Sequence, residues 1–572
     1  MSRLLSGAVR LRARVVLPRF EQDVRDPVAA QRRVLREILS KNAATAFGRE
    51  HGFRSIADPR EYCGRVPVRD YEGLRPWVDR LLAGERGVLT AEEPSMFATT
   101  SGTTSHPKVI PVTRAWMREL SAVMCLWLYF CLRDHPDLLS GKVVSVVGPA
   151  VEGHTARGAP LGCISGLTQS KVPLFLRRNY VLPESVSRIS SYDDRYAIAA
   201  RLMLGAQVSA VATANPSTLL RLARIASERA ERIVAAVHDG RLGVVPPHAS
   251  TSEDAARQAS LYRQIEARLR PDPGRARALE TCMKEHGGLR PRDAWPRLAL
   301  ICCWLGGSAG VQSRRIPDDY GDAPIRDIGL RATEATVTVP IRDGTPAGVL
   351  ALGGNFYEFA PTEEAEPENP RTLLAHELEE GGRYRLLLTT RSGLYRYDIN
   401  DVVEVRGFHH NAPLLAFLRK GDDMANITGE KLHADQVASA FQAAVAETNL
   451  PAVQVQLIPD AEASCYDLLV ELDHTRSADL HRFSAAFDRG LARQNIEYRQ
   501  KRKSGRLHTF RIWRMEPGWS TRRQRNDVER NGKRDSQYKW PILNPTWDEQ
   551  TRAEVAETPR AGVVGAEAGA WR

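Results

Sequence analysis

The stretch AQVSAVATANPSTLLRLARIASERAERIVAAV (206–237) decides the fold class of this chain. It begins with a short Val-rich run, which is typical of a buried parallel strand. Asn215, Pro216 and Ser217 then supply a helix cap and a proline for the first helical turn. The apolar residues that follow recur with helical spacing. A strand that leads into a helix in this way indicates an α/β fold.

Further strands are expected on both sides of this unit. The runs KVVSVVGPA (142–150) and LALICCWL (298–305) resemble it and predict two more buried parallel strands. TPAGVLALGGNFYEFAP (345–361) predicts a strand, a glycine turn and a strand. YRLLLTTRSGLYRYDINDVVEVRGF (384–408) predicts two β runs joined by a turn at 391–393. DPVAAQRRVLREILSKNAATAFG (27–49) has helical periodicity.

The apolar pattern stops near RKGDDM (419–424) and resumes in a second region. There, AVQVQLIP (452–459) and YDLLVELD (466–473) predict strands, and LHRFSAAFDRGLARQ (480–494) predicts a helix. This spacing suits a small α+β domain. We therefore predict an α/β protein with a large N-terminal domain and a smaller α+β C-terminal domain. The expected boundaries are 1–420 for the large domain, 421–427 for a hinge, 428–547 for the small domain and 548–572 for a disordered tail.

Composition excludes several classes of protein. The chain has 572 residues, 42% apolar and 26% charged, which is ordinary for a globular protein and excludes wholesale disorder, collagen and coiled coil. The net charge of +11 is concentrated in residues 499–539, which hold 14 Lys or Arg against 4 Asp or Glu. Interleaved Tyr and Trp make a nucleic-acid surface one interpretation of this stretch. The favoured one is a solvated basic face.

The cysteines and the ends of the chain bear on its location. None of the eight Cys forms a CxxC pair, and no His stands at a zinc-ligand spacing, so a reducing compartment without structural zinc is expected. The uncharged run LSAVMCLWLYFCL (120–132) is shorter than the roughly 20 residues of a spanning helix. The Arg-rich N-terminus has no acidic residue before Glu21. It predicts an amphipathic first helix, with a transit peptide as the alternative.

A hydroxyl-rich loop is the strongest local signal for chemistry. FATTSGTTSHPK (97–108) places hydroxyl side chains around one glycine and ends in Lys108. Backbone N–H groups and hydroxyls in such a loop can cradle an anion, to which Lys108 adds a positive charge. The pattern is not a Walker A loop. A Ser/Thr-rich surface turn is the alternative interpretation.

A second signal, GGSAG (306–310), follows a predicted strand and fits G-x-S-x-G. It would make Ser308 the nucleophile of an α/β-hydrolase, with the HGG at 286–288 nearby in sequence. Only about twenty residues separate the two, which leaves little room for a helix and a strand between them. The other interpretation is a glycine turn that lets a planar ligand approach the backbone.

Two carboxylate-bearing segments follow. In GLRATEA (329–335), Thr333 and Glu334 put a hydroxyl beside a carboxylate, a pair that suits Mg²⁺. In GLYRYDINDV (393–402), a carboxylate after an aromatic-rich run can accept both hydroxyls of a ribose. Taken singly, each is more simply a helix cap with a surface acid, or a hairpin with a turn Asp.

In this order and spacing, the motifs resemble those of the plant auxin-responsive Gretchen Hagen acyl acid amido synthetases and their bacterial relatives. This family belongs to the adenylate-forming superfamily. The resemblance runs from about Gln31 to Leu543, nearly the whole chain. It includes the segments FYEFAP (356–361), APLLAFLRK (412–420), YRQKRKSG (498–505) and QYKWPIL (537–543). The resemblance implies a large adenylation domain of several sheets and a mobile small domain.

The resemblance also implies roles for particular residues. The ATP phosphates would be bound by the loop residues Thr100, Ser101, Gly102, Thr103 and Thr104. The adenine pocket would be lined by Gly307 and Ser308, phosphate would be contacted by Thr333, and the ribose hydroxyls would be bound by Asp401. Arg419 would act at the hinge. The implied catalytic residues are Lys108, Glu334 as the Mg²⁺ ligand, and Lys539.

Two departures from the family pattern affect these roles. An adenine-stacking aromatic residue is replaced around Leu330 and Arg331. In addition, Asp398 rivals Asp401 as the ribose ligand, because YDIND (397–401) stands where a Val-Gly-Asp type of sequence is usual.

The predicted function is an ATP- and Mg²⁺-dependent ligase that converts a carboxylic acid to an acyl-adenylate and transfers the acyl group to an amine, an amino acid by expectation. One alternative keeps adenylation and makes a thioester with coenzyme A or a carrier protein. Others are a serine hydrolase that uses Ser308, and a nucleic-acid-binding protein that uses 499–539. The expected setting is a cytoplasmic monomer with small-molecule substrates and neither a nucleic-acid nor a membrane partner.

Overall fold

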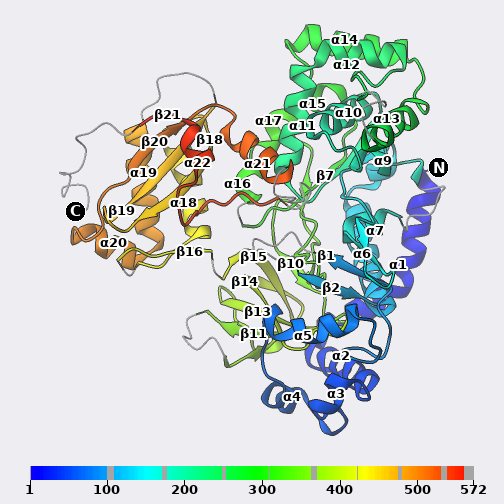
Figure 1. Cartoon of the computed structure of the whole chain (residues 1–572), viewed down its shortest axis with the longest axis vertical. Helices are drawn as coiled ribbons and strands as arrows, with labels where there is room; N and C mark the ends of the chain where they lie inside the picture. Colours follow the sequence, from blue (N-terminus) through cyan, green and yellow to red (C-terminus); the bar gives the residue numbers. More distant parts are fainter. Residues whose placement is uncertain are drawn as a thin grey trace. The chain divides into compact units, whose positions relative to one another are not determined.

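The computed structural model describes residues 2–99, 108–170, 177–247, 253–307, 309–362, 370–421, 423–428, 430–473, 480–529 and 538–558 (Figure 1). It divides into two compact units. The large unit comprises Met1–Gly306 and Gln312–Phe417, and the small unit comprises Gly307–Val311 and Leu418–Arg572. The division after Phe417 lies three residues before the boundary expected from the sequence.

The large unit begins with helices α1 (Ser2–Arg25), α2 (Pro27–Asn42), α3 (Ala46–Glu50), α4 (Pro59–Arg65) and α5 (Tyr71–Leu82) and the 3₁₀ turn η1 (Phe53–Ser55). The expected first helix is confirmed as α1. The helical periodicity over 27–49 is confirmed and corresponds to two helices, because α2 ends at Asn42. The Thr45 side chain then accepts a hydrogen bond from the Gly48 N–H and caps the new helix α3.

A four-stranded parallel sheet confirms the α/β prediction. Its strand order is β3-β6-β7-β8. The strands are β3 (Lys142–Ser145), β6 (Val208–Ala212), β7 (Leu300–Cys302) and β8 (Ile325–Arg326). The Asn215 side chain caps α11 (Pro216–Glu228) by accepting from the Ser217 N–H at 3.0 Å. The expected helix breaks at Arg229 and continues as α12 (Ala230–Asp239).

Further helices lie before and between these strands in the sequence. They are α7 (Ile164–Ser170), α9 (Glu184–Ser187), α10 (Tyr192–Leu204), α13 (Glu253–Glu266), α14 (Pro273–His286), α15 (Pro291–Ala294), α16 (Ala309–Ser313), α17 (Ile316–Tyr320) and the 3₁₀ turn η2 (Pro136–Leu139).

A second sheet of the large unit has seven strands in the order β12-β11-β13-β14-β15-β10-β9. Its members are β9 (Thr338–Val339), β10 (Gly348–Leu350), β11 (Phe356–Pro361), β12 (Leu373–Leu374), β13 (Arg383–Thr389), β14 (Tyr397–His409) and β15 (Ala412–Lys420), with η3 (Ala375–Glu377) after β12. The antiparallel pair β13 and β14 is confirmed. The two strands expected over 345–361 exist, but they are not partners, since β10 pairs with β15 and β9 while β11 pairs with β13 and β12.

A third, smaller sheet has the order β2-β1-β5-β4 and holds β1 (Met96–Thr99), β2 (Val109–Val112), β4 (Gly153–His154) and β5 (Pro160–Gly162). Helix α6 (Arg114–Asp134) follows β2. By length and composition α6 is long enough and apolar enough to cross a membrane, although the uncharged run within it is not. Its Trp116 and Leu120 belong to one buried apolar cluster and its Trp127 and Phe130 to the main core. These contacts are those of a core helix.

The small unit is an α+β body. Its main sheet has the order β18-β19-β20-β21, with β18 (Ala452–Asp460), β19 (Cys465–Leu472), β20 (Arg511–Met515) and β21 (Val555–Glu557); β16 (Met424–Ala425) and β17 (Leu432–His433) form a separate pair. Its helices are α18 (Ala434–Thr448), α19 (Leu480–Gln494), α20 (Ile496–Lys503), α21 (Trp519–Glu529) and α22 (Glu549–Ala553). Phe441 of α18 and Phe483 and Phe487 of α19 are buried with β19 in one core.

The disordered tail expected from residue 548 is wrong for its first part. Asp548 caps α22, and β21 pairs with β20. Two ion pairs hold this segment, Arg523 with Asp548 and Arg522 with Glu554. The sequence lacks apolar periodicity here because these charged contacts hold much of the segment. Residues 559–572 lie outside the described residues.

Candidate active site

The hydroxyl-rich loop connects two paired strands. Thr99, the last residue of β1, lies opposite Val109, the first of β2. Residues 100–107, which include Thr100, Ser101, Gly102, Thr103 and Thr104, lie outside the described residues. Lys108 is described and half-buried at the entry to β2. The backbone N–H of the next residue, Val109, donates to the Tyr71 hydroxyl oxygen at 2.7 Å, which holds this end of the loop.

Lys108 is linked to Glu334 through Tyr397. The Lys108 ammonium donates to the Tyr397 hydroxyl at 3.4 Å, and that hydroxyl donates to Glu334 Oε1 at 3.3 Å. Lys108 Nζ also lies 5.9 Å from the ring centres of Tyr71 and Tyr397. The end of the first motif, the second motif and the third therefore meet at one point of the large unit.

Glu334 is presented by a tight turn. The Ala332 N–H donates to the Ala335 carbonyl at 2.9 Å, and Arg331 and Thr336 form an antiparallel bridge outside it. Thr333 and Glu334 occupy the two central positions. Glu334 is 7% exposed, and its backbone carbonyl accepts from Trp116 Nε1 of α6 at 2.9 Å. The turn is thus fixed through its backbone, so the Glu334 carboxylate is not needed to hold the turn in place.

Tyr397 is fully buried at the start of β14. Burial and the neighbouring Glu334 carboxylate raise the pKa of Tyr397, so its hydroxyl stays protonated and can donate to Glu334. The resemblance assigned no role to this residue. The only sign of a role in the sequence was its position in the run LYRYD, beside the predicted ribose ligands. That sign is weak, because an aromatic residue in a buried strand is usually part of the core.

The two rival aspartates of the third motif differ in their surroundings. Asp398 lies 2.9 Å from Arg385 Nε and accepts from the Asn400 N–H at 2.8 Å. Between them, β14 bulges away from β13, and Asn400 takes a left-handed φ of 59°. A bulge of this kind re-aims the side chains that follow it. Asp401 follows at 3% exposure.

The glycines of the second signal have structural roles of their own. A side chain at Gly306 would place its Cβ 2.9 Å from the Phe417 carbonyl oxygen. Gly307 takes a φ of 56°, which favours glycine. Ser308 lies outside the described residues. Gly287 of the HGG sequence is the left-handed C-cap of α14, so this sequence ends a helix and has no need of a hydrolase role.

Arg331, near the position where the resemblance implies a stacking aromatic residue, lies over the Trp127 ring with its guanidinium carbon 5.4 Å from the ring centre. Burial lowers the pKa of Arg331 to about 10, with Asp327 acting in the opposite direction. Burial also raises the pKa of Asp327 to about 7, although its carboxylate accepts from the Leu305 and Gly329 N–H groups. Leu330 packs at the edge of the core.

In the small unit, Arg419 is the second-last residue of β15 and makes several contacts with the segment that follows it. Its Nη1 donates to the carbonyls of Lys420 and Gly421, both at 3.1 Å, and its Nε lies 3.3 Å from Asp435 Oδ1. These contacts fix the course of residues 419–421. They place a positive charge where the expected hinge begins.

Lys539 is exposed between two buried aromatic residues of the small unit, Tyr538 and Trp540. The Trp540 indole donates to the Val455 carbonyl at 2.8 Å and packs edge-on against Trp519. Lys539 also lies near Asp423. Burial raises the pKa of Asp423, while the Lys420 N–H and the charge of Lys539 counteract it. The aromatic anchors therefore display the lysine outwards.

Many cations of the basic stretch are paired within the small unit. Arg511 contacts Asp467 and Asp460, and Arg502 contacts Asp488. Arg514 and Arg522 pair with Glu557 and Glu554. The acids come from other parts of the sequence, so the fold neutralises part of the local excess of charge. This arrangement weighs against a nucleic-acid surface.

The large unit has a further hollow of about 740 Å³ among α2, η1 and the start of α4. Its lining includes Arg32, Arg36 and Arg54. Among the described residues, none of those predicted for the active site lines it, so this hollow is separate from the Lys108–Tyr397–Glu334 chain.

The fold of this chain is also found in proteins of known structure. The structure is similar to a solved GH3.15 acyl acid amido synthetase, with a TM-score of 0.80, 20% identity, and coverage of 96% of this chain and 98% of that one. The two share a fold. Family models match the chain in three parts: the GH3 family N-terminal domain over residues 16–325, the central domain over 348–420 and the C-terminal domain over 435–546.

The chain belongs to the GH3 family, and the resemblance seen in the motifs is confirmed. A probable indole-3-acetic acid-amido synthetase of Oryza sativa subsp. japonica is 28% identical over 73% of this chain and 70% of its own length. A jasmonoyl–L-amino acid synthetase of Nicotiana attenuata is 22% identical over 75% of each chain. The predicted class, an amide-forming ligase, is the class that these relatives' names give.

Proposed function

We propose that this chain is an ATP-dependent ligase that joins a small carboxylic acid to an amine, an amino acid by preference, through an acyl-adenylate. The observation that carries the proposal is the Lys108–Tyr397–Glu334 chain, which joins three of the sequence motifs in one unit. Eight free thiols support a reducing, cytoplasmic setting.

The reaction has two steps. A carboxylate oxygen of the acid attacks the α-phosphorus of ATP, and pyrophosphate leaves. The amine nitrogen then attacks the acyl carbon, AMP leaves with the bonding electrons, and the nitrogen loses a proton to give the amide. Both steps gather negative charge on phosphate oxygens, so cations and hydrogen-bond donors held around them lower the barrier.

The residues of the large unit suit these needs. Lys108 holds a positive charge at the end of the hydroxyl-rich loop, and Tyr397 keeps the Glu334 carboxylate in one orientation. Glu334 and the adjacent Thr333 offer the hard oxygen donors that Mg²⁺ takes, and both lie at the tip of a fixed turn. A Mg²⁺ ion bound there would neutralise charge on the phosphates.

Other residues would bind the ribose of the nucleotide and contact the acyl group. We assign the ribose hydroxyls to Asp401, the position to which the family resemblance gives this role and which is buried in the bulge of β14. The loop residues Thr100, Ser101, Gly102, Thr103 and Thr104 would cradle the phosphates, and Gly307 and Ser308 would face adenine. Lys539 and Arg419 of the small unit would act in the first step, with 421–427 as the hinge.

The test is ATP–pyrophosphate exchange with a panel of aryl, indolyl and aliphatic carboxylic acids. Exchange that depends on one acid and falls about 10²–10³-fold in Glu334→Gln supports adenylation. The matched control is Glu447→Gln, which alters an exposed ion pair with Arg489 and should leave exchange unchanged. Screening amines, coenzyme A and amino acids for AMP release then separates amide from thioester formation. Folded protein that exchanges pyrophosphate with no acid would contradict the proposal.

A further inference from the structure

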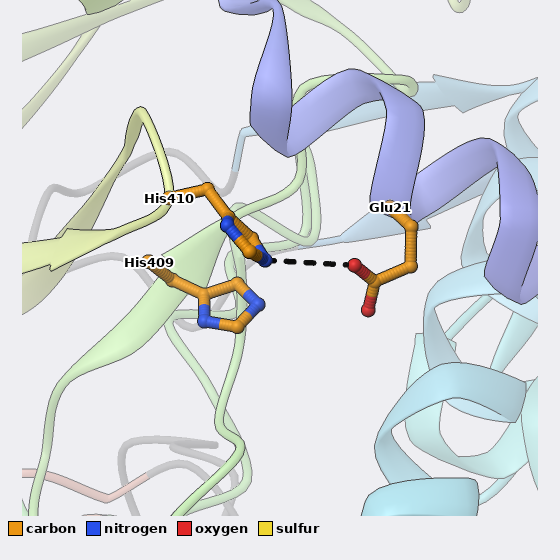
Figure 2. Close-up of side chains that lie close together, drawn as sticks. All are labelled: Glu21, His409 and His410. Carbon is orange, nitrogen blue, oxygen red and sulfur yellow. Dashed lines mark ion pairs between the residues drawn. The ribbon is translucent and has the colours of Figure 1, made fainter.

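Three potential metal ligands meet at a place outside the active-site motifs. Glu21 comes from α1, and His409 and His410 come from the end of β14 and the turn that follows it (Figure 2). One ligand atom of each residue lies within 4.8 Å of the other two. All three belong to the large unit. Two imidazoles and a carboxylate form a donor set typical of transition-metal sites in proteins.

The fold holds the two elements together next to this cluster. Asn411, in the same turn as His410, donates its backbone N–H to the Val24 carbonyl at 3.0 Å and its side-chain amide to the Arg25 carbonyl at 2.6 Å. These bonds attach the C-terminal end of α1 to the β14–β15 turn. Glu21 lies one helical turn before Arg25, which brings its carboxylate to the two histidines.

The geometry of the cluster leaves ligand atoms available. His410 Nε2 lies 3.7 Å from Glu21 Oε2, the contact dashed in Figure 2. His409 Nε2 is buried, and no residue in the described part of the chain bonds to it. The His409 ring is inclined by 22° to the Phe20 ring, with 6.4 Å between the ring centres. A buried polar nitrogen of this kind calls for a partner.

The turn conformation adds a second observation. His410 takes a left-handed φ of 52°, which is uncommon for a residue with a side chain. Side chains held in such conformations cluster at functional sites. The His410 and Glu21 side chains are 43% and 33% exposed, so space is available for them to turn towards a bound ion. Ligand atoms around a tetrahedral zinc lie roughly 3.3 Å apart for bonds of about 2.0–2.1 Å, so modest movements would complete the geometry.

The surrounding charges set the strength of binding. Burial and the neighbouring His410 lower the pKa of His409, while the Glu21 carboxylate acts in the opposite direction. Arg133 and Arg342 also lower the pKa of His409. Arg25 lies 3.8 Å from the Glu21 carboxylate. These cations oppose a divalent ion and predict weaker binding than at a structural zinc site.

We propose that Glu21, His409 and His410 bind a divalent transition-metal ion of the Zn²⁺ type, with an open position for water. The mixed nitrogen and oxygen donors favour such an ion over Mg²⁺ or Ca²⁺, which take oxygen ligands. The bound ion clamps α1 to the β14–β15 turn. This clamp is independent of the proposed ligase activity, and its ligands are too far apart in the sequence to show a metal-binding spacing.

The test is a metal titration of the full chain, stripped of metal by a chelator and kept reduced. Isothermal titration with Zn²⁺, and visible absorption with Co²⁺, should show one site in the wild type. His410→Ala and Glu21→Gln should each weaken that site at least tenfold. The matched control is His238→Ala, an exposed histidine paired with Asp239, which should leave it unchanged. Zn²⁺ should also raise the melting temperature of the wild type but not that of His410→Ala.

Two results would overturn the proposal. One is a wild-type chain that binds neither Zn²⁺ nor Co²⁺ at the concentrations used. The other is binding that His410→Ala and Glu21→Gln leave unchanged, which would assign the ion to the free thiols or another site. Both altered side chains are at least partly exposed, so the variants are expected to fold. The melting temperatures of the metal-free variants check this.

Discussion

The Tyr397 hydroxyl donates to Glu334 Oε1 at 3.3 Å, which couples the third sequence motif to the second. The same hydroxyl accepts from Lys108 at 3.4 Å. Tyr397 is buried, so both contacts are made away from bulk water, where hydrogen bonds to charged groups are strongest. A residue that the family resemblance left without a role thereby positions the two charged groups on either side of it.

Replacing Tyr397 by Phe should slow adenylation without unfolding the chain. The change removes one hydroxyl that bonds to two charged groups, worth about 1.5–3 kcal/mol, so we expect a roughly tenfold to hundredfold fall in pyrophosphate exchange. Tyr395→Phe is the control, because the Tyr395 hydroxyl is equally buried but donates to the Leu89 carbonyl. Equal losses of exchange in both variants would assign Tyr397 to packing alone.

The ribose assignment can be tested by a pair of variants. Asp401→Asn should raise the KM for ATP about tenfold or more, because it removes an acceptor for charge-assisted hydrogen bonds. Asp398→Asn should weaken the contact with Arg385 and change stability more than the KM for ATP. The measurement is the ATP dependence of pyrophosphate exchange beside thermal melting. The reverse pattern would identify Asp398, and not Asp401, as the residue that binds the ribose hydroxyls.

Lys539 should act in the first half-reaction only. Lys539→Ala should lower pyrophosphate exchange about 10²–10³-fold, the usual cost of removing one group that stabilises transition-state charge. The rate at which Lys539→Ala converts a preformed acyl-adenylate and the amine to product should be near that of the wild type. Lys503→Ala is the control, since Lys503 is another exposed lysine of the small unit. A loss in both half-reactions would argue against a small unit that acts in the first step only.

Glu119 gives the stability of the large unit a defined pH dependence. Burial raises the pKa of Glu119 to about 8 from its ordinary value of 4.5, with Arg391 and the Asn355 amide acting in the opposite direction. Between these two pH values the unfolded chain releases a proton that the folded chain retains. Stability therefore falls as pH rises through this window, by about 1.4 kcal/mol per pH unit for this group at most.

Glu119→Gln should remove this dependence. Relative to the wild type, the variant should gain stability steadily from pH 5 to pH 8 in denaturant unfolding, and the difference should level off above pH 8. Comparing the two proteins at each pH cancels the titration of other groups. A constant difference across the range would show that Glu119 is ionised in the folded chain.

The C-terminal segment should contribute to the stability of the small unit. A chain that ends at residue 547 loses α22, β21 and the ion pairs of Asp548 and Glu554. The lost hydrogen bonds and pairs are worth on the order of 2 kcal/mol, or roughly 5 °C in melting temperature for a unit of this size. A chain that ends at residue 558 is the control and should melt like the wild type. Equal melting temperatures of the two shortened chains would show that residues 548–558 add no stability, as expected of a loose tail.

The local sequence determined the elements and the class of this protein. Val-rich runs, the Asn215 cap and the helical spacing of apolar residues are short-range signals, so the parallel strands, α11 and α19 follow from them. The motifs were also recognisable in order, because a hydroxyl-rich loop or a Thr-Glu pair keeps its chemistry as a string. They sufficed to identify the family.

Only the tertiary structure decided which residues meet. The pairing of β10 with β15, the bulge that separates Asp398 from Asp401, and the attachment of α1 to the β14–β15 turn all join segments or depend on partners distant in sequence. Tyr397 is an aromatic residue in a buried strand by sequence, and a link between Lys108 and Glu334 by structure. The physical reason is that strand register and side-chain burial depend on the whole packed core, which no local pattern records.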